Sequence, residues 1–227
     1  MTTEPIVTLP ETSPLHAPLD GLLATSAVRL PYQHNVLLRS FVLERPGGNM
    51  IVYNSPGINS SAEAIMDRGG AARLLINHAH EAMYGVPEFD VPVYVHEGDR
   101  AEVAGSLPVS AVFDRRQMIG EDLEVIPTPG HTAGTTSYLW NNGDRRFLFT
   151  GDFIWIEHGE WKAVVLDEHL RGDYLASLAQ VRDLDFDVLV PWGTTDDGPP
   201  FGLVGGKDEI RSRVDAVIDR VRAGGRR

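Results

Sequence analysis

The chain has 227 residues, of which 42% are hydrophobic and 23% charged, as expected for one globular domain with a substantial core. With 32 acidic and 20 basic residues, its net charge of −12 argues against nucleic acid or an anionic membrane surface as a partner. Because it has no cysteine, disulfides, thiolate metal ligands and a cysteine nucleophile are excluded. A metal site in this chain must therefore use His, Asp or Glu.

The N-terminal segment, residues 1–18, contains four prolines and is expected to be a loosely ordered lead-in. It lacks the basic stretch and apolar core that are typical of a signal peptide. No apolar run approaches the ~18 residues needed to span a membrane. We expect a single domain over residues 1–227, with 222–227 as a solvated tail, in a cytoplasmic protein whose oligomeric state the sequence does not indicate.

The pattern of apolar residues predicts both strands and helices. Short apolar runs predict strands at 35–43, 50–53, 73–76, 92–95, 123–126, 135–140, 146–149 and 186–190. Helical spacing predicts helices at 60–69, 97–104, 174–184 and 210–221. Turn sequences at 46–49 and 141–144 indicate hairpins in both halves of the chain. Because hairpins and helices are interleaved, we expect mixed sheets covered by helices.

Three histidines and one aspartate come directly after predicted strands. His78 and His80 follow the strand at 73–76, and they would project to the same face if the chain stays extended. His131 follows Pro129-Gly130, and Asp152 follows Gly151 at the end of another apolar run. Side chains at strand ends can meet at the rim of a sheet. Imidazole and carboxylate groups there predict a site for one divalent cation, with zinc favoured and iron or manganese as alternatives.

These motifs resemble those of the metallo-β-lactamase superfamily of metallohydrolases, over about residues 35–194. The family's HxHxDH motif corresponds to residues 78–83, its PGHTxGxxxY-like stretch to 129–138, and its hydrophobic-Gly-Asp stretch to 149–152. The resemblance implies an α/β fold, namely a four-layer αββα sandwich of two mixed β-sheets flanked by helices. It also implies a first metal site of His78, His80 and His131, with Asp152 as the bridging ligand.

The chain departs from the family pattern where a second cation would bind. By resemblance, that site needs a carboxylate at Ala82, a histidine at Met83 and a histidine at Gly193, and all three are missing. Ala and Gly offer no ligand, and a thioether is a poor ligand for a hard or borderline cation. We therefore expect a mononuclear site.

The missing carboxylate at position 82 also removes a candidate general acid or base. The neighbouring Glu81 is a candidate replacement, although in an extended chain it would point to the opposite side. Tyr84, just after the first motif, and Trp192, just before Gly193, are candidates for the wall of a substrate pocket.

Three functions are compatible with this pattern. The first is a mononuclear metallohydrolase that cleaves an ester, lactone or amide-type small molecule. The second is a degenerate, non-catalytic member that binds a small molecule or partner without a metal cofactor. The third is a mononuclear iron enzyme with oxygen chemistry, because two histidines and one carboxylate form a facial triad. The sequence does not choose the substrate, since one fold can serve many chemistries.

Overall fold

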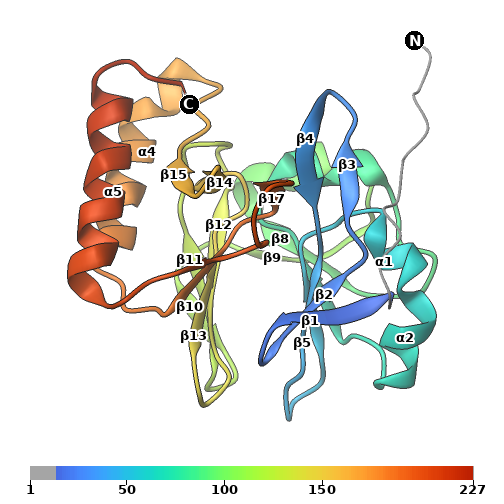
Figure 1. Ribbon diagram of the computed structural model, residues 1–227. Coiled ribbons are helices and arrows are strands. Elements are labelled where there is room, and N and C mark those ends of the chain that lie inside the picture. Colours follow the sequence, from blue (N-terminus) through green and yellow to red (C-terminus); the bar gives the residue numbers. More distant parts are fainter. Residues whose placement is uncertain (1–13, 227) are drawn as a thin grey trace.

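The computed structural model describes residues 14–226 and shows a layered α/β architecture (Figure 1). Two β-sheets face each other, one layer of helices covers the outer face of each, and a smaller sheet lies at the upper end in that view. The expected αββα sandwich is confirmed. In addition to the two facing sheets, the described chain forms a third hydrogen-bonded sheet.

The first sheet has seven strands within residues 14–226, in the order β1-β2-β5-β6-β7-β8-β9. They span Leu15–Leu19 (β1), Leu22–Thr25 (β2), Phe41–Leu43 (β5), Met50–Val52 (β6), Arg73–Leu75 (β7), Val93–His96 (β8) and Val109–Phe113 (β9). The pairs from β6 to β9 are parallel and the others antiparallel. Of the lead-in expected at 1–18, residues 1–13 lie outside the described chain, whereas Leu15–Leu19 form the strand β1.

The second sheet has six strands in the described chain, in the order β10-β11-β12-β13-β16-β18. They span Gln117–Ile119 (β10), Leu123–Pro127 (β11), Thr136–Asn141 (β12), Arg146–Phe149 (β13), Val188–Val190 (β16) and Gly202–Leu203 (β18). Its β13–β16 pair is parallel, so this sheet is also mixed.

The third sheet has the order β15-β14-β17-β4-β3 among the described residues. Its strands span Val28–Leu30 (β3), Gln33–Leu38 (β4), Trp155–Glu157 (β14), Glu160–Lys162 (β15) and Gly193–Thr195 (β17). They come from the beginning, the middle and the end of the chain. The third sheet thus ties the two halves of the sandwich together at one end.

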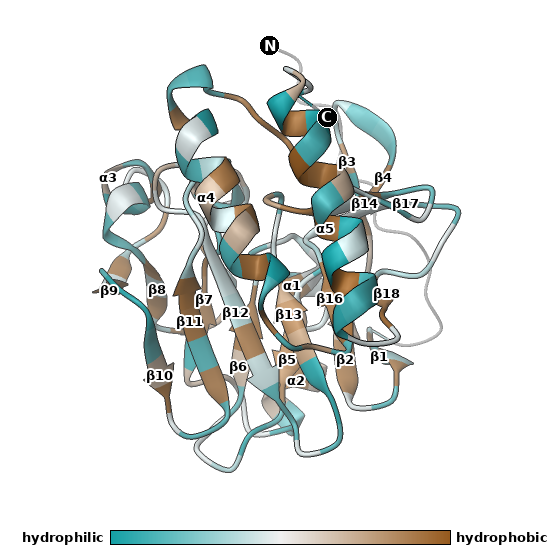
Figure 2. Ribbon diagram, turned by 90° about the vertical axis from the view of Figure 1, so that its left-hand side faces the viewer, coloured by the Kyte–Doolittle hydropathy of each residue, from teal (hydrophilic) through white to brown (hydrophobic). Residues whose placement is uncertain are grey.

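The helices are mostly short. The α-helices span Gly57–Ser60 (α1), Ala62–Asp67 (α2), Arg100–Val103 (α3), Arg171–Arg182 (α4) and Lys207–Arg222 (α5), and the 3₁₀ helices span Ala79–Tyr84 (η1), Glu97–Asp99 (η2) and Glu168–Leu170 (η3). Figure 2 shows α4 and α5 in front of the largely hydrophobic strands of the second sheet. The helices α1, α2 and α3 cover the outer face of the first sheet.

The alternation of side chains along the strands divides the core into layers. On β5, Phe41 and Leu43 point into the core between the two main sheets, whereas Val42 points outward under the helices. On β6, Val52 points inward and Ile51 outward in the same way. Because both faces of these strands are buried, their sequences read as continuous apolar runs.

The predicted strand at 35–43 is wrong in one respect, since it is two strands in different sheets. The chain leaves β4 of the third sheet at Leu38 and enters β5 of the first sheet at Phe41. Between them, the Arg39 N–H donates to the Trp192 carbonyl and the Ser40 N–H to the Thr25 hydroxyl, at 3.3 and 3.1 Å. The residues that flank this change of sheet, 36–38 and 41–43, are all buried and apolar, so the apolar pattern does not reveal it.

The predicted helix at 60–69 begins earlier and is broken at Ser61, between α1 and α2. Among the described residues, no helix has both the length and the apolar character needed to cross a membrane. The cytoplasmic location stays a prediction.

Candidate metal centre

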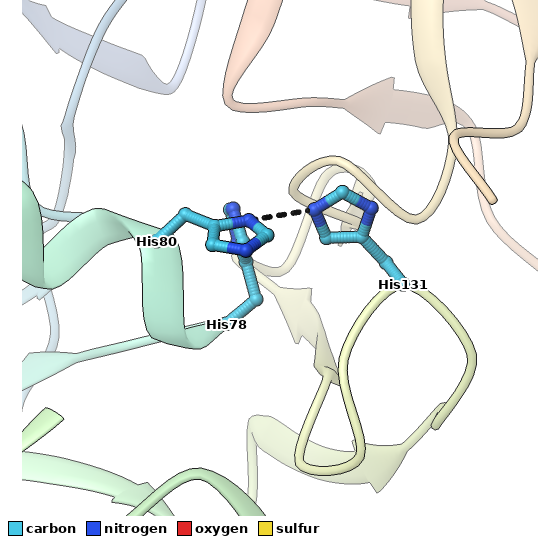
Figure 3. Close-up of side chains that lie close together, drawn as sticks. All are labelled: His78, His80 and His131. Carbon is cyan, nitrogen blue, oxygen red and sulfur yellow. Dashed lines mark hydrogen bonds between the residues drawn. The ribbon is translucent and has the colours of Figure 1, made fainter. Parts of the chain in front are cut away.

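The predicted ligands lie together at the end of the sandwich where the third sheet meets the other two. His78 follows β7, His80 lies in η1, His131 lies in the loop after β11, and Asp152 lies in the loop after β13. Figure 3 shows the imidazole rings of the three histidines turned toward one another. Residues that are far apart in sequence thus meet because their strands end at the same rim.

The donor atoms of the three histidines all lie within 4.8 Å of one another. His80 Nδ1 is 3.0 Å from His131 Nε2. The Asp152 carboxylate is near the same point, with Oδ2 3.7 Å from His78 Nε2 and 3.9 Å from His131 Nε2. One point can therefore be approached by three ring nitrogens and one carboxylate oxygen, which is a typical ligand set for zinc or iron.

The extended geometry expected for residues 78–80 is wrong. His78 is extended, with φ −151° and ψ 161°, but Ala79 begins the 3₁₀ helix η1. His80 therefore approaches the cluster from the first turn of a helix, and its Nδ1 faces His131, whereas His78 presents Nε2. The two histidines converge by different routes rather than by the period of a strand.

Hydrogen bonds fix the orientation of two of the rings. His78 Nδ1 lies 3.0 Å from the side-chain oxygen of Asn77, and His131 Nδ1 lies 2.8 Å from the Val164 carbonyl. An N–H at each Nδ1 leaves the Nε2 lone pair free to face the cluster. His78 Nε2 is buried and has no hydrogen-bond partner in the described chain, as expected for an atom aimed at a cation.

The three rings are held in the neutral form that binds metals. Burial lowers the pKa of His78 and of His80, and lowers that of His131 well below its usual value. Neighbouring histidines lower the pKa of His80 and His131 further, whereas the charge of Asp152 raises that of His78. Because a ligating imidazole must be neutral, burial prepares the site for a cation at ordinary pH.

Asn77 couples this site to the loop that carries Asp152. Its side-chain amide donates to the Thr136 carbonyl, and its side-chain oxygen contacts His78. Gly151 packs directly on it, since a Cβ at position 151 would lie 1.7 Å from that oxygen. Gly151 also has a positive φ of 57°, a conformation that favours glycine. The glycine before Asp152 is thus required by backbone conformation and by close packing.

A second carboxylate, Asp99, braces both histidine loops and was not singled out by the sequence. It is 3% exposed and accepts hydrogen bonds from the Ala79 N–H at 2.9 Å, the Thr132 hydroxyl at 2.5 Å and the Gly134 N–H at 2.7 Å. No motif marked this residue, because its partners come from two distant segments. Asp99 positions the loops without being among the clustered donors.

The candidate role of Glu81 as an acid or base is not supported by its position. Its side chain is fully buried and accepts hydrogen bonds from the backbone N–H groups of Asn54 and Asn77, both at 2.8 Å, and of His78 at 3.2 Å. Burial raises its pKa to about 8, and these N–H groups oppose that increase. Both oxygens accept from backbone N–H groups, Oε1 also lies 3.2 Å from His78 Nδ1, and Glu81 is not among the residues that line the cavity.

Tyr84 and Trp192 lie behind the cluster rather than beside its opening. The Trp192 ring packs edge-on against His78, with centroids 5.1 Å apart, and its indole N–H donates to the Asn54 carbonyl at 3.1 Å. Trp192 is 2% exposed and Tyr84 packs on it at 5.9 Å. Neither lines the cavity beside the cluster, among the residues that the structure describes. A role in substrate binding stays a prediction.

The three positions of the expected second site offer no ligand. Ala82 is buried under the first sheet's helices, Met83 is 51% exposed, and Gly193 lies in β17 against β4. Within residues 14–226, the clustered donors that could hold a metal ion are His78, His80 and His131.

A cavity of about 230 Å³ opens beside the cluster. His80, His131 and Asp152 form one part of its wall. The rest comes from the third sheet and the segment after β15, and consists of Leu30, Tyr32, Gln33, Val36, Leu38, Trp155, Val164, Leu166 and Gly193. A small molecule in this cavity would touch the clustered donors.

Solved structures support the fold independently of these residues. The metallo-beta-lactamase GOB-18 from Elizabethkingia meningoseptica superposes with a TM-score of 0.61 at 15% identity, covering 97% of this chain and 98% of that chain. A beta-lactamase domain protein from Burkholderia ambifaria gives a TM-score of 0.63 at 18% identity, covering 95% and 74%. The subclass B3 metallo-beta-lactamase BJP-1 of Bradyrhizobium japonicum gives 0.59 at 16% identity, covering 94% of each chain.

One curated relative is similar in sequence over a limited stretch. A hydroxyacylglutathione hydrolase from Erwinia tasmaniensis is 35% identical over 88 residues, which are 37% of this chain. The match spans about a third of the length of that relative, 33%. The family profile described as Metallo-beta-lactamase superfamily matches residues 61–193, which include all four clustered side chains. The chain is therefore a member of the metallo-β-lactamase superfamily.

Proposed function

We propose that the chain is a metal-dependent hydrolase with one divalent cation, held by His78, His80, His131 and Asp152. The observation that carries the proposal is the convergence of three imidazole nitrogens, one of which is the buried and unpartnered Nε2 of His78, with the Asp152 carboxylate within 3.9 Å of two of the rings. Neutral rings and fixed ring orientations make the donor set fit a cation of the zinc type. Iron or manganese would fit the same oxygen and nitrogen donors.

A cation at this point would supply Lewis acidity, which polarises a substrate carbonyl and makes water a better nucleophile near neutral pH. The chain's own residues would orient the reactants. Asp152 is the only carboxylate in the described wall of the cavity, and its side chain is 25% exposed. It is thus the group placed to accept a proton from the attacking water and return it to the leaving group. His80 and His131 line the same wall and exclude bulk water from one side.

The substrate is proposed to be a small molecule with an ester, lactone or amide bond. The cavity is of a size for small molecules, and the partial likeness to a hydroxyacylglutathione hydrolase favours hydrolysis of an activated acyl group. Two alternative functions, an iron enzyme and a non-catalytic binding protein, would use the same site. Two histidines with Asp152 would also suit a single iron, and the missing carboxylate at Ala82 suits a protein that binds without catalysis.

The test is hydrolysis of a panel of esters, thioesters, lactones and amides by protein supplied with zinc, manganese or iron(II). We expect metal-dependent turnover of at least one acyl class. Turnover should be abolished in His131→Ala and reduced at least about 100-fold in Asp152→Asn. The exposed His169→Ala is the matched control and should retain activity. Metal-loaded protein that hydrolyses no member of the panel, or activity that survives His131→Ala, would contradict the proposal.

A further inference from the structure

The cavity beside the cluster has two unlike parts. The polar part contains the clustered donors His80, His131 and Asp152. Most of the remaining wall is aliphatic or aromatic and is formed by β3, β4, β14, β17 and the segment after β15. A ligand that placed a carbonyl at the donors would therefore extend its remaining atoms over an apolar surface.

The wall contains no lysine or arginine among the residues that the structure describes. Two arginines adjoin wall residues in the sequence, Arg29 beside Leu30 and Arg39 beside Leu38, and neither side chain belongs to the wall. Arg29 is bonded to Asp196 at 2.7 Å and to the His34 carbonyl. The chain as a whole carries a net charge of −12. An anionic group on the ligand would find no cation in the apolar part, and it would lose its hydration there.

Gly193 helps to form this apolar space. It lies in β17, opposite Leu38 of β4, and a Cβ at this position would lie 3.1 Å from Val36 Cγ1 and 3.2 Å from Leu38 Cδ2. Val36 and Leu38 line the cavity with it. A larger side chain at 193 would have to enter the space that these residues border. The position where relatives are expected to carry a second-site histidine is thus part of the apolar wall.

Two large hydrophobic side chains continue the apolar wall out to the solvent. Tyr32, in the turn between β3 and β4, is 68% exposed, and Leu166, after β15, is 56% exposed. Both line the cavity. Exposed apolar side chains around a concave site mark a surface that a ligand covers. Here they sit at the mouth of a cavity whose interior is also apolar.

Three side chains of this wall carry a hydrogen-bond donor, namely Tyr32, Gln33 and Trp155. Trp155 is 5% exposed and lines the cavity, and its indole N–H has no acceptor among residues 14–226. Buried indole N–H groups normally have a partner. Because this nitrogen is itself buried, a ligand in the cavity would contact the indole ring rather than the N–H.

We propose that the cavity binds the apolar arm of an uncharged acyl compound, so that the substrate is a neutral ester or lactone with an aliphatic chain. The substrate class rests on the proposed hydrolase function, whereas the binding preference rests on the cavity alone. The arm lies against Leu30, Val36, Leu38 and Leu166, and the carbonyl lies at the donor cluster. Anionic acyl compounds are excluded because the apolar wall offers no cation.

Binding is measured by calorimetry with amides as probes. The protein is metal-free, so that the amides are not hydrolysed during the measurement. Octanamide is the uncharged probe, and suberic acid monoamide, which ends the same chain in a carboxylate, is its charged match. We expect octanamide to bind at least about tenfold more tightly than its charged match, and affinity to rise about fourfold per methylene from butanamide to octanamide.

Leu166→Arg should abolish the preference for octanamide and strengthen binding of the charged amide. Leu203→Arg is the matched control, because Leu203 is 55% exposed and lies on β18 away from the cavity, and it should leave both affinities unchanged. Gly193→Ala should weaken octanamide binding. Circular dichroism of each variant identifies a loss of folding, and Leu166→Arg replaces an exposed side chain, so it is expected to fold.

Equal affinity for the two amides, or affinity that does not depend on chain length, would overturn the inference. So would a Leu166→Arg variant whose affinities for the two amides equal those of the unaltered protein. The outcome is separable from that of the proposed hydrolysis. A protein that binds octanamide but hydrolyses nothing when loaded with metal refutes the hydrolase and its substrate class, and leaves the binding preference standing. A protein that hydrolyses anionic esters faster than neutral ones refutes the substrate class and leaves the hydrolase standing.

Discussion

His80 Nδ1 and His131 Nε2 lie 3.0 Å apart although the residues are 51 positions apart in the chain. His131 presents Nε2 because its Nδ1 is bonded to the Val164 carbonyl, and His80 presents Nδ1 because it starts from the first turn of η1. Burial favours the neutral form of both rings. Two lone pairs directed at one point need a proton or a cation between them, and the carboxylate of Asp152 nearby favours a cation.

Removing the Asn77 side chain should weaken metal binding without removing a ligand. Its oxygen lies 3.0 Å from His78 Nδ1, so Asn77→Ala removes the nearer of two acceptors at this nitrogen and leaves Glu81 Oε1 at 3.2 Å. We expect the affinity for zinc to fall about 10- to 100-fold in a competitive chelator titration. Asn59→Ala, which removes a half-buried amide away from the cluster, is the control. Unchanged affinity in Asn77→Ala would show that this contact does not orient His78.

Gly151→Ala should damage both stability and the site. The new Cβ would lie 1.7 Å from the Asn77 oxygen, in a backbone with φ 57°. We expect a loss of about 2 to 4 kcal/mol in the free energy of unfolding, measured by urea denaturation, together with weaker metal binding.

Gly159→Ala separates the two causes, because Gly159 also has a positive φ, 82°, but has open space around its Cβ position. It should cost only about 1 kcal/mol and leave metal affinity unchanged. If the two variants behave alike, backbone strain rather than contact with Asn77 explains the glycine.

The Arg45–Asp122 pair should make stability depend on acid pH. Arg45 on the first sheet's hairpin donates its Nε–H to Asp122 of the second sheet at 2.7 Å, and this bond holds the pKa of Asp122 below its usual value. A lowered pKa means that the pair stabilises the fold above about pH 4, the unfolded pKa, and that this contribution is lost as pH falls through the lower folded pKa.

Asp122→Asn should therefore cost about 2 kcal/mol at pH 7, because the Arg45 side chain is 4% exposed and would lose its charged partner. The difference from the unaltered protein should shrink below about pH 4. Urea denaturation at several pH values measures it. Asp114→Asn, in a pair that is more than half exposed, is the control and should have little effect at any pH. A cost that stays constant down to pH 2 would contradict the electrostatic account.

The sequence predicted where strands end better than it predicted which sheet each strand belongs to. The apolar runs before His131 and Asp152 stop where β11 and β13 stop, so both side chains could be assigned to a sheet rim. The change of sheet at Arg39 and Ser40 left no signal, because residues 36–38 and 41–43 on either side of it are buried and apolar. The third sheet was missed because its other strands, β3, β14, β15 and β17, have only three residues each and give no recognisable apolar run.

The residues that orient the ligands also could not be predicted from the sequence. The partner of His131 is the backbone carbonyl of Val164, and a carbonyl has no residue-type signature. The position of Glu81 depended on whether residues 78–84 are extended or helical, and η1 turns its carboxylate onto the backbone N–H groups of Asn54 and Asn77. The ligand set was readable from sequence, but its supporting contacts depend on the tertiary fold.

The central claim is one cation per chain at His78, His80, His131 and Asp152, and metal content tests it most directly. Elemental analysis compares protein purified without chelator, and after addition of zinc or iron(II), with the double variant His78→Ala/His131→Ala. We predict about one equivalent of metal in the unaltered protein and almost none in the variant. No metal after supplementation, two equivalents, or equal content in both proteins would contradict the mononuclear site.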